Sequence, residues 1–386
     1  MADGTRLNLM TGKHTDPVVL LQDLIRIPSV NPPGDEAACA ALCADILTDI
    51  GFEVTLHDFG ERRVNLVARP PGKRPGNNLG FSGHLDTVPL GGSTWAYPPF
   101  SGEIADGRVY GRGSSDMKGG IAAFISACGR HYARTGLCPD VTVILTGGEE
   151  TGCEGATALV SDPLLTDCYF TGLLIGESTR NYPVIGHKGV LWFECTAEGR
   201  TAHAAMPDLG VNAIYRATDA IMRLRSADPG KDDSILGKNT VTVGMFHGGM
   251  NINSVPDRAC FSVDARTSSA EAHSGISGTI RGCLCSAMSL QTLLDIPPVI
   301  TASDHPFVQA VHALAIRHGV VDRGIVTVPY FTDAAIFSPA FKNSPSVIIG
   351  PGEPDVAHKT DEYCPVDSLM TAANLYSDCI DFFSGS

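Results

Sequence analysis

Apolar and polar positions follow two periodicities along the first 185 residues. Short apolar runs of strand length are separated by segments in which apolar residues recur three and four positions apart, as on one face of a helix. This pattern favours an α/β fold, with a mostly parallel twisted sheet flanked by helices. The predicted strands are Val64–Arg69, Leu79–Gly83, Val141–Thr146 and Leu173–Gly176, and the predicted helices are Asp16–Arg26, Asp35–Ile50 and Met117–Ala133.

The order of elements changes between about residues 187 and 298. The strands expected there are Gly189–Ala197, Thr240–His247, Ala259–Arg266 and Leu290–Ile296, and the helices are Asp208–Arg225 and Ser269–Met288. They give the order βαββαβ, which is typical of an α+β ferredoxin-like domain. Helix His305–His318, strand Ser346–Ile349 and helix Pro365–Phe383 then return to the first pattern. We therefore predict a catalytic domain of residues 1–186 and 299–386, and an inserted domain of residues 187–298.

Composition and charge exclude several classes of function. The 386 residues include 28 Lys and Arg against 42 Asp and Glu, a formal net charge of −14. A negative chain is repelled by phosphate backbones and anionic lipid, so we expect no nucleic-acid and no membrane partner. The first ten residues lack a signal-peptide pattern, which predicts a cytoplasmic protein. The twelve cysteines form no CxxC pair and are interpreted as buried apolar residues.

Acidic and imidazole side chains follow several predicted strands. In open α/β sheets, ligands bind beyond the carboxyl ends of the strands, so these side chains are expected at one edge of the sheet. An aspartate at the start of the predicted helix Met117–Ala133 is expected at the same edge. The residues are His84, Asp86, Asp116, Glu149, Glu150, Glu177 and His358.

Imidazole and carboxylate groups together suit zinc, cobalt and manganese ions. More groups converge than one ion requires, so two divalent ions that share a bridging carboxylate fit the count better. Asp86 lies two positions after His84 and can orient its imidazole ring. Glu149 and Glu150 are adjacent and point in opposite directions on an extended backbone, so one can bind metal while the other acts as a base.

Five motifs carry a resemblance that covers nearly the whole chain. They are GHLDTVP (83–89), GRGSSDMKGG (111–120), GGEETG (147–152), IGES (175–178) and the late segment GPG…AHKTDEY (350–363). In this order they resemble the M20 metallopeptidase and amidohydrolase family, which includes acetylornithine deacetylase and succinyl-diaminopimelate desuccinylase.

The resemblance implies a role for each residue of the cluster. His84 and Glu177 would hold one ion, Glu150 and His358 would hold the other, and Asp116 would bridge them. Asp86 would orient His84, Glu149 would be the general base, and the peptide bond after Asp116 would be cis. Zinc is the ion expected first, with cobalt as the alternative.

The resemblance also assigns residues outside the metal cluster. His203, in GRTAHAAMPDLGVNAI (199–214), would donate to the oxyanion across a homodimer formed by the inserted domain. Asn253 in NINSVP and Arg266 in SVDART match positions that bind the substrate carboxylate, a task that suits an Arg fork. Gly350 and Gly352 are weaker substrate-binding candidates.

Within the family, Glu177 resembles the deacylase and carboxypeptidase branches, since the aminopeptidase and dipeptidase branches usually carry Asp there. The predicted function is hydrolysis of the amide bond of a small N-acyl amino acid. The alternative is a carboxypeptidase that acts on an N-acyl glutamate or a short peptide. The segment Tyr330–Asp333 lacks the Gly-Thr-Ser stretch that would contact a succinyl group. The resemblance therefore does not imply specificity for a succinyl group.

The sequence disfavours two functions from other classes. A non-catalytic binding protein on this scaffold would have lost a ligand or the base, yet all seven positions are filled. An RNA-binding module would need aromatic residues on the central strands of residues 187–298 with basic surroundings, and the sequence offers little of either.

Overall fold

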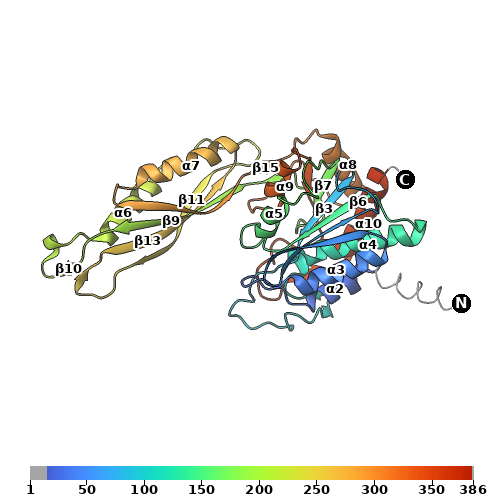
Figure 1. Ribbon diagram of the computed structural model, residues 1–386, viewed down its shortest axis with the longest axis horizontal. Coiled ribbons are helices and arrows are strands. Elements are labelled where there is room, and N and C mark those ends of the chain that lie inside the picture. Colours follow the sequence, from blue (N-terminus) through green and yellow to red (C-terminus); the bar gives the residue numbers. More distant parts are fainter. Residues whose placement is uncertain (1–14, 385–386) are drawn as a thin grey trace. The chain divides into compact units, whose positions relative to one another are not determined.

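The computed structural model describes residues 15–384, which divide into two compact units. The first unit contains the described residues up to Ile185, Ile300–Val326 and those from Thr332 onward. The second contains Gly186–Val299 and Thr327–Phe331. Both units are drawn in Figure 1, where the second carries α6 and α7 and the first carries α2, α3 and α4.

A six-stranded mixed sheet forms the centre of the first unit, in the order β1-β2-β6-β3-β7-β16. The strands β6, β3, β7 and β16 run parallel to one another, and β2 is antiparallel to both of its neighbours. The predicted α/β class is confirmed, and the unpredicted β1 extends one edge. The strands are β1 Glu53–Gly60, β2 Arg63–Arg69, β3 Leu79–His84, β6 Val141–Thr146, β7 Gly172–Ile175 and β16 Ser346–Ile348.

Five helices share one hydrophobic core with this sheet. They are α2 Pro17–Ile25, α3 Ala37–Asp49, α4 Gly119–Thr135, α8 Pro306–Arg317 and α10 Val366–Ser384. Phe81 of β3 stacks on Phe124 of α4 at a centroid distance of 4.0 Å and meets Tyr376 of α10 edge-on. Because β3 lies in this core, the polar residues at its carboxyl end start from a rigid support.

Shorter elements complete the first unit. The helices α5 Glu154–Leu159 and α9 Ala334–Ala340 contact each other, and α5 also contacts β2. A three-stranded sheet joins β4 Ile104–Ala105, β5 Arg108–Tyr110 and β17 Tyr363–Pro365 in the order β17-β5-β4. The pairing of β17 with β5 therefore holds two distant parts of the chain side by side.

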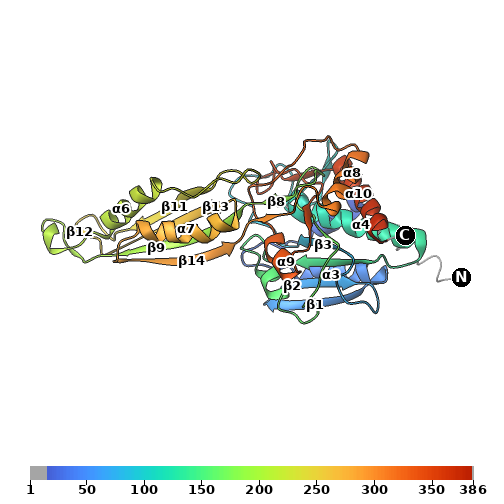
Figure 2. The same ribbon diagram turned by 90° about the horizontal axis from the view of Figure 1, so that it is seen from above.

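The second unit has the predicted βαββαβ order and the ferredoxin-like strand order β11-β13-β9-β14, with every neighbouring pair antiparallel (Figure 2). Its elements are β9 Gly189–Glu198, α6 Ala213–Arg225, β11 Thr240–Gly248, β13 Arg258–Thr267, α7 Ala270–Cys283 and β14 Met288–Ile296. Its core includes Phe193, Phe261 and Ile276. The sheet leaves β11 as an edge strand.

Helix ends in this unit differ from the prediction for local reasons. A short 3₁₀ turn, Pro207–Leu209, precedes α6, which begins at Ala213 instead of Asp208. The side chain of Asn212 accepts hydrogen bonds from the backbone N–H groups of the first turn, so it is the cap that fixes this start. Ser269 caps α7 in the same way, and this helix ends at Cys283, before the predicted Met288.

Two further properties bear on function. No helix within residues 15–384 is both long and apolar enough to span a bilayer. The twelve cysteines are all free thiols, and nine of them are buried.

The minor strands are β8 Gly186–His187, β10 Ala202–His203, β12 Ser254–Val255 and β15 Val299–Ile300.

His187 makes the stability of the second unit depend on pH. The ring is fully buried, Nδ1 donates to the carbonyl of Lys188, and Nε2 has no hydrogen-bond partner in the described chain. Burial lowers the pKa of His187 to about 4. In the unfolded chain an imidazole titrates near pH 6.5. Between that pH and about 4, His187 is therefore protonated in the unfolded state and neutral in the folded state. Stability from this group is therefore present above about pH 6.5 and is lost as the pH falls toward 4.

We expect His187→Asn, which keeps a donor near the position of Nδ1, to lose less stability on acidification than the wild type. The difference between pH 7 and pH 4 should reach about 3 kcal/mol. Urea unfolding at several pH values, monitored in the second unit through Trp192, measures it. Parallel pH dependences of the two proteins would contradict the prediction.

Candidate metal centre

The parallel strands deliver their polar residues to one edge of the sheet. His84 ends β3 and lies opposite Thr146, the last residue of β6, which is followed directly by the turn Gly147-Gly148 and then Glu149 and Glu150. Glu177 follows β7 by two residues. Asp116 lies in the segment Ser114–Lys118 before α4, where its own backbone is not helical (φ −118°, ψ 94°), and the Asp116–Met117 peptide bond is cis.

The structure brings the five predicted metal ligands into two groups that share Asp116. His84, Asp116 and Glu177 offer ligand atoms within 4.8 Å of one another, and so do Asp116, Glu150 and His358. Oδ1 of Asp116 lies 3.1 Å from Nε2 of His84, and its Oδ2 lies 3.1 Å from Nε2 of His358. Nε2 of His358 is also 3.1 Å from Oε2 of Glu150. Each oxygen of the Asp116 carboxylate thus faces the histidine of one of the two groups.

The buried carboxylates of this cluster repel one another, and bound cations would relieve that repulsion. Burial raises the pKa of Glu149, Glu150 and Glu177, and repulsion among neighbouring carboxylates raises it further. Burial lowers the pKa of His84, but the surrounding carboxylates outweigh it and raise the pKa well above its usual range. Hydrogen bonds to Asp116 and Glu150 raise the pKa of His358 to about 10.

One buried acceptor in the cluster also lacks a partner. Oε1 of Glu150 is shielded from solvent and receives no hydrogen bond in the described chain. An unsatisfied buried carboxylate oxygen is costly, and a bound cation would satisfy it. Imidazole and carboxylate donors in two groups with a shared member therefore fit two divalent ions.

Asp86 fixes the backbone of the two adjacent glutamates. Its Oδ1 accepts the N–H of Glu149 at 3.2 Å, and its Oδ2 accepts the N–H of Glu150 at 3.3 Å. Glu150 joins the second ligand group, whereas Glu149 belongs to neither group and is only 6% exposed. A buried carboxylate next to the ligands but outside the ligand set is placed as a base would need to be.

The imidazole of His84 is oriented by the main chain of Asp86. Nδ1 of His84 lies 2.9 Å from the carbonyl oxygen of Asp86 and 3.6 Å from its carboxylate Oδ1. A proton on Nδ1 leaves Nε2 to face Asp116 and Glu177. Orientation of the ring thus comes from the carbonyl group, which frees the carboxylate to hold the Glu149-Glu150 turn.

Sequence reasoning missed two buried polar residues beside the cluster. The amide of Asn31 donates to Oδ2 of Asp86 at 2.9 Å and to Thr151. Asp333 accepts from the Thr146 hydroxyl, its Oδ1 has no partner in residues 15–384, and burial raises its pKa to about 6. Asn31 precedes two prolines and resembles a turn former in sequence, and Asp333 lies more than 180 positions from Thr146, so no local pattern marks either residue.

Gly350 and Gly352 lie against the segments that carry metal ligands. A Cβ atom on Gly350 would be 2.5 Å from the carbonyl of Glu177, and one on Gly352 would be 2.3 Å from the carbonyl of Ser115. The N–H of Gly350 donates to the Thr179 hydroxyl. Both glycines therefore permit close backbone packing around the cluster.

The remaining candidates belong to the second unit. Nδ1 of His203 accepts the N–H of Ala205, which places the ring proton on Nε2. Both oxygens of Asp264 engage the guanidinium of Arg266, at 2.8 and 2.9 Å. Asn253 is exposed, and its carbonyl accepts the N–H of Ala204, one residue after His203.

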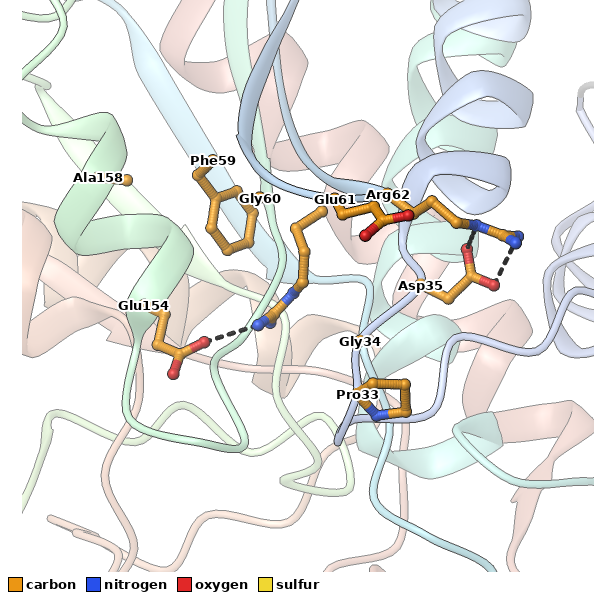
Figure 3. A pocket seen from close by; sticks show the side chains of 10 residues that line it. Pro33, Gly34, Asp35, Phe59, Gly60, Glu61, Arg62, Glu154 and Ala158 are labelled. Carbon is orange, nitrogen blue, oxygen red and sulfur yellow. Dashed lines mark hydrogen bonds and ion pairs between the residues drawn. The ribbon is translucent and has the colours of Figure 1, made fainter.

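A surface pocket of about 700 Å³ lies beside β1, β2 and α5 and contains none of the predicted ligands (Figure 3). Its arginines are already paired, Arg62 with Asp35, and Arg63 with Glu154 and the buried Glu36. A Cβ atom on Gly148 would be 2.6 Å from Nη2 of Arg63. Arg63 at this pocket therefore packs against Gly148, in the turn before Glu149.

Solved structures and curated relatives resemble most of the chain. An M20 family metallo-carboxypeptidase from Sulfolobus solfataricus superposes with a TM-score of 0.81 at 16% identity, covering 96% of this chain and 99% of that one. At this identity the likeness concerns the fold alone.

Two bacterial relatives are more similar in sequence. The probable succinyl-diaminopimelate desuccinylase of Staphylococcus epidermidis is 28% identical over 94% of this chain and 96% of its own length. A succinyl-diaminopimelate desuccinylase of Cereibacter sphaeroides is 35% identical over 68% of this chain and 70% of its own length. The profile of "Peptidase family M20/M25/M40" matches residues 80–381. The chain therefore belongs to this peptidase family and is a hydrolase.

Proposed function

We propose that this hydrolase uses two divalent metal ions to cleave the amide bond of a small N-acyl amino acid. The observation that carries the proposal is the pair of ligand groups that share Asp116, with the buried carboxylate of Glu149 beside them. The relatives named succinyl-diaminopimelate desuccinylase support an N-acylated amino acid as the substrate class.

His84 and Glu177 would hold one ion, Glu150 and His358 the other, and Asp116 both. Zinc or cobalt ions in these positions would polarise the amide carbonyl and make water more acidic. Glu149 would accept the proton of the attacking water and deliver it to the leaving nitrogen.

Specificity for an amino acid would come from the second unit. Arg266 would bind the substrate carboxylate in place of Asp264, which now engages the guanidinium in the bidentate manner of a free carboxylate. Exposed Asn253 would contribute a further polar contact. The same contacts suit the carboxypeptidase alternative, in which the released amino acid is the carboxyl-terminal residue of an N-acyl glutamate or short peptide.

His203 would donate from Nε2 to the developing oxyanion of a neighbouring subunit. The edge strand β11 supports the homodimer this requires, because an unpaired edge can join a second copy. Met245 and Phe246 on this strand are 59% and 40% exposed, which adds apolar surface to the edge.

Metal removal tests the proposal directly. We expect the purified protein to hold two divalent ions per chain, to lose activity on exhaustive chelation and to regain it when zinc or cobalt is restored. Elemental analysis and activity after each step measure this. An active protein without a transition metal would end the proposal.

A substrate panel distinguishes the two activities. N-acetyl, N-formyl and N-succinyl amino acids, including N-succinyl-diaminopimelate, are offered beside N-acyl glutamates and short peptides. Highest kcat/KM on the simple acyl amino acids supports the deacylase, and highest kcat/KM on the N-acyl glutamates or peptides supports the carboxypeptidase. Failure to cleave any of them with two ions bound would contradict both.

A further inference from the structure

A fully buried ion pair lies behind the metal cluster. Nη1 of Arg112 is 2.7 Å from Oε2 of Glu362, and both side chains are 1% exposed. Arg112 also donates to the carbonyls of Lys359 and Pro89, and its guanidinium lies over the ring of Trp95. The pair therefore joins the loop after β5 to the loop that carries His358.

The carboxylate of Glu362 accepts hydrogen bonds from the backbone of the loop that carries Asp116. Its Oε1 accepts the N–H groups of Ser115 at 2.8 Å and Asp116 at 3.0 Å. Its Oε2 accepts the N–H of Gly113 at 3.0 Å in addition to Arg112. Gly113 has φ +84°, and a Cβ atom there would be 2.6 Å from Cγ2 of Thr87. All four hydrogen bonds of this carboxylate thus hold one short loop in one conformation.

The two ends of this network adjoin two of the predicted metal ligands, Asp116 and His358. The amide of Asp116 is fixed by Glu362, and the carboxylate of the same residue faces His84 and His358 at 3.1 Å each. The carbonyl of Lys359, held by Arg112, belongs to the residue after His358. A shift of either loop would move Asp116 relative to His358 and open the second ligand group.

Stability alone gives little reason for a buried ion pair. Two buried charges lose their hydration, and a well-packed apolar pair of similar volume is often as stable or more so. Here the four hydrogen bonds are directional, and the positive charge of Arg112 keeps Glu362 from adding net negative charge beside Asp116. The geometry therefore serves placement of the ligands better than it serves folding.

We infer that Arg112 and Glu362 are positioning residues that set the affinity of the centre for its metal ions. They do so by holding Asp116 and His358 in fixed positions relative to each other. The inference rests on the proposed function, since it assumes that these groups bind metal. It goes beyond that function because neither residue touches the ions or the substrate.

The test is metal affinity. Glu362→Gln keeps the volume, but its amide group must face two of the four donors. Metal-free protein is titrated with Co²⁺, followed by visible absorption, and with Zn²⁺ in competition with a chromophoric chelator. We expect at least one of the two sites to bind 10–100-fold more weakly, the usual effect of outer-shell partners. Arg112→Lys, which keeps the charge and one donor nitrogen, should bind metal more tightly than Arg112→Met.

A matched control separates placement from stability. Val311→Ala creates a cavity in the core at the buried face of α8 and should lower Tm without weakening metal binding. Wild-type affinity in both Glu362→Gln and Arg112→Met would overturn the inference, as would an equal loss of affinity in Val311→Ala at equal Tm. If Glu362→Gln does not fold, the two Arg112 variants decide. Absence of metal binding in the wild type would instead contradict the proposed function.

Discussion

Replacing Glu149 with Ala should lower kcat by roughly 10²–10⁴ while both metal ions stay bound. Glu149 is buried beside the ligands but belongs to neither ligand group, so its loss removes a proton acceptor and leaves the donor set complete. Glu149→Gln should give a similar loss with less change in volume. Steady-state kinetics and metal content, measured on the same samples, test both parts.

The neighbouring glutamate is the matched control. Glu150→Ala removes a member of the second ligand group and should reduce bound metal from two ions to about one per chain. Both variants change the same short turn, whose N–H groups are held by Asp86 in either case. If Glu149→Ala lost metal and Glu150→Ala kept it, the roles of the two residues would be reversed.

The metal-ligand cluster could be predicted from the sequence because the end of an apolar run marks the end of a strand. Each strand carries an apolar run, and the first polar residues after a run in a parallel sheet must lie at the carboxyl edge. His84 and the Glu149-Glu150 pair follow that rule. Asp116 does not follow a strand, and its place at the shared position came from the resemblance.

Other parts could not be predicted because they depend on contacts between distant residues. Asp86 was expected to orient His84 through its carboxylate, but Nδ1 of His84 lies closer to the main-chain carbonyl oxygen of Asp86, a contact that no sequence pattern shows. Glu362 lies in a quoted motif, yet its partner Arg112 is 250 positions away. The strand β1 was missed because all its positions are half-buried or exposed, and it carries no apolar run.

The second large effect concerns His203. His203→Ala should lower kcat by about 10²–10³, the usual loss for one oxyanion donor. All the candidate metal ligands lie in the first unit and His203 lies in the second, on the short ribbon formed by β10 and β12. The proposal that it acts across a homodimer therefore makes a prediction that a residue acting within its own chain would not make.

Mixing two inactive variants provides the test. In a dimer of one Glu149→Ala chain and one His203→Ala chain, one site has both defects and the other has neither. At equal amounts and with free exchange of subunits, about a quarter of the wild-type activity should return, since half of the dimers are mixed and each has one intact site. Differently tagged chains confirm the exchange. If exchange is proven and no activity returns, or if a monomer is fully active, His203 does not complete the site of another subunit.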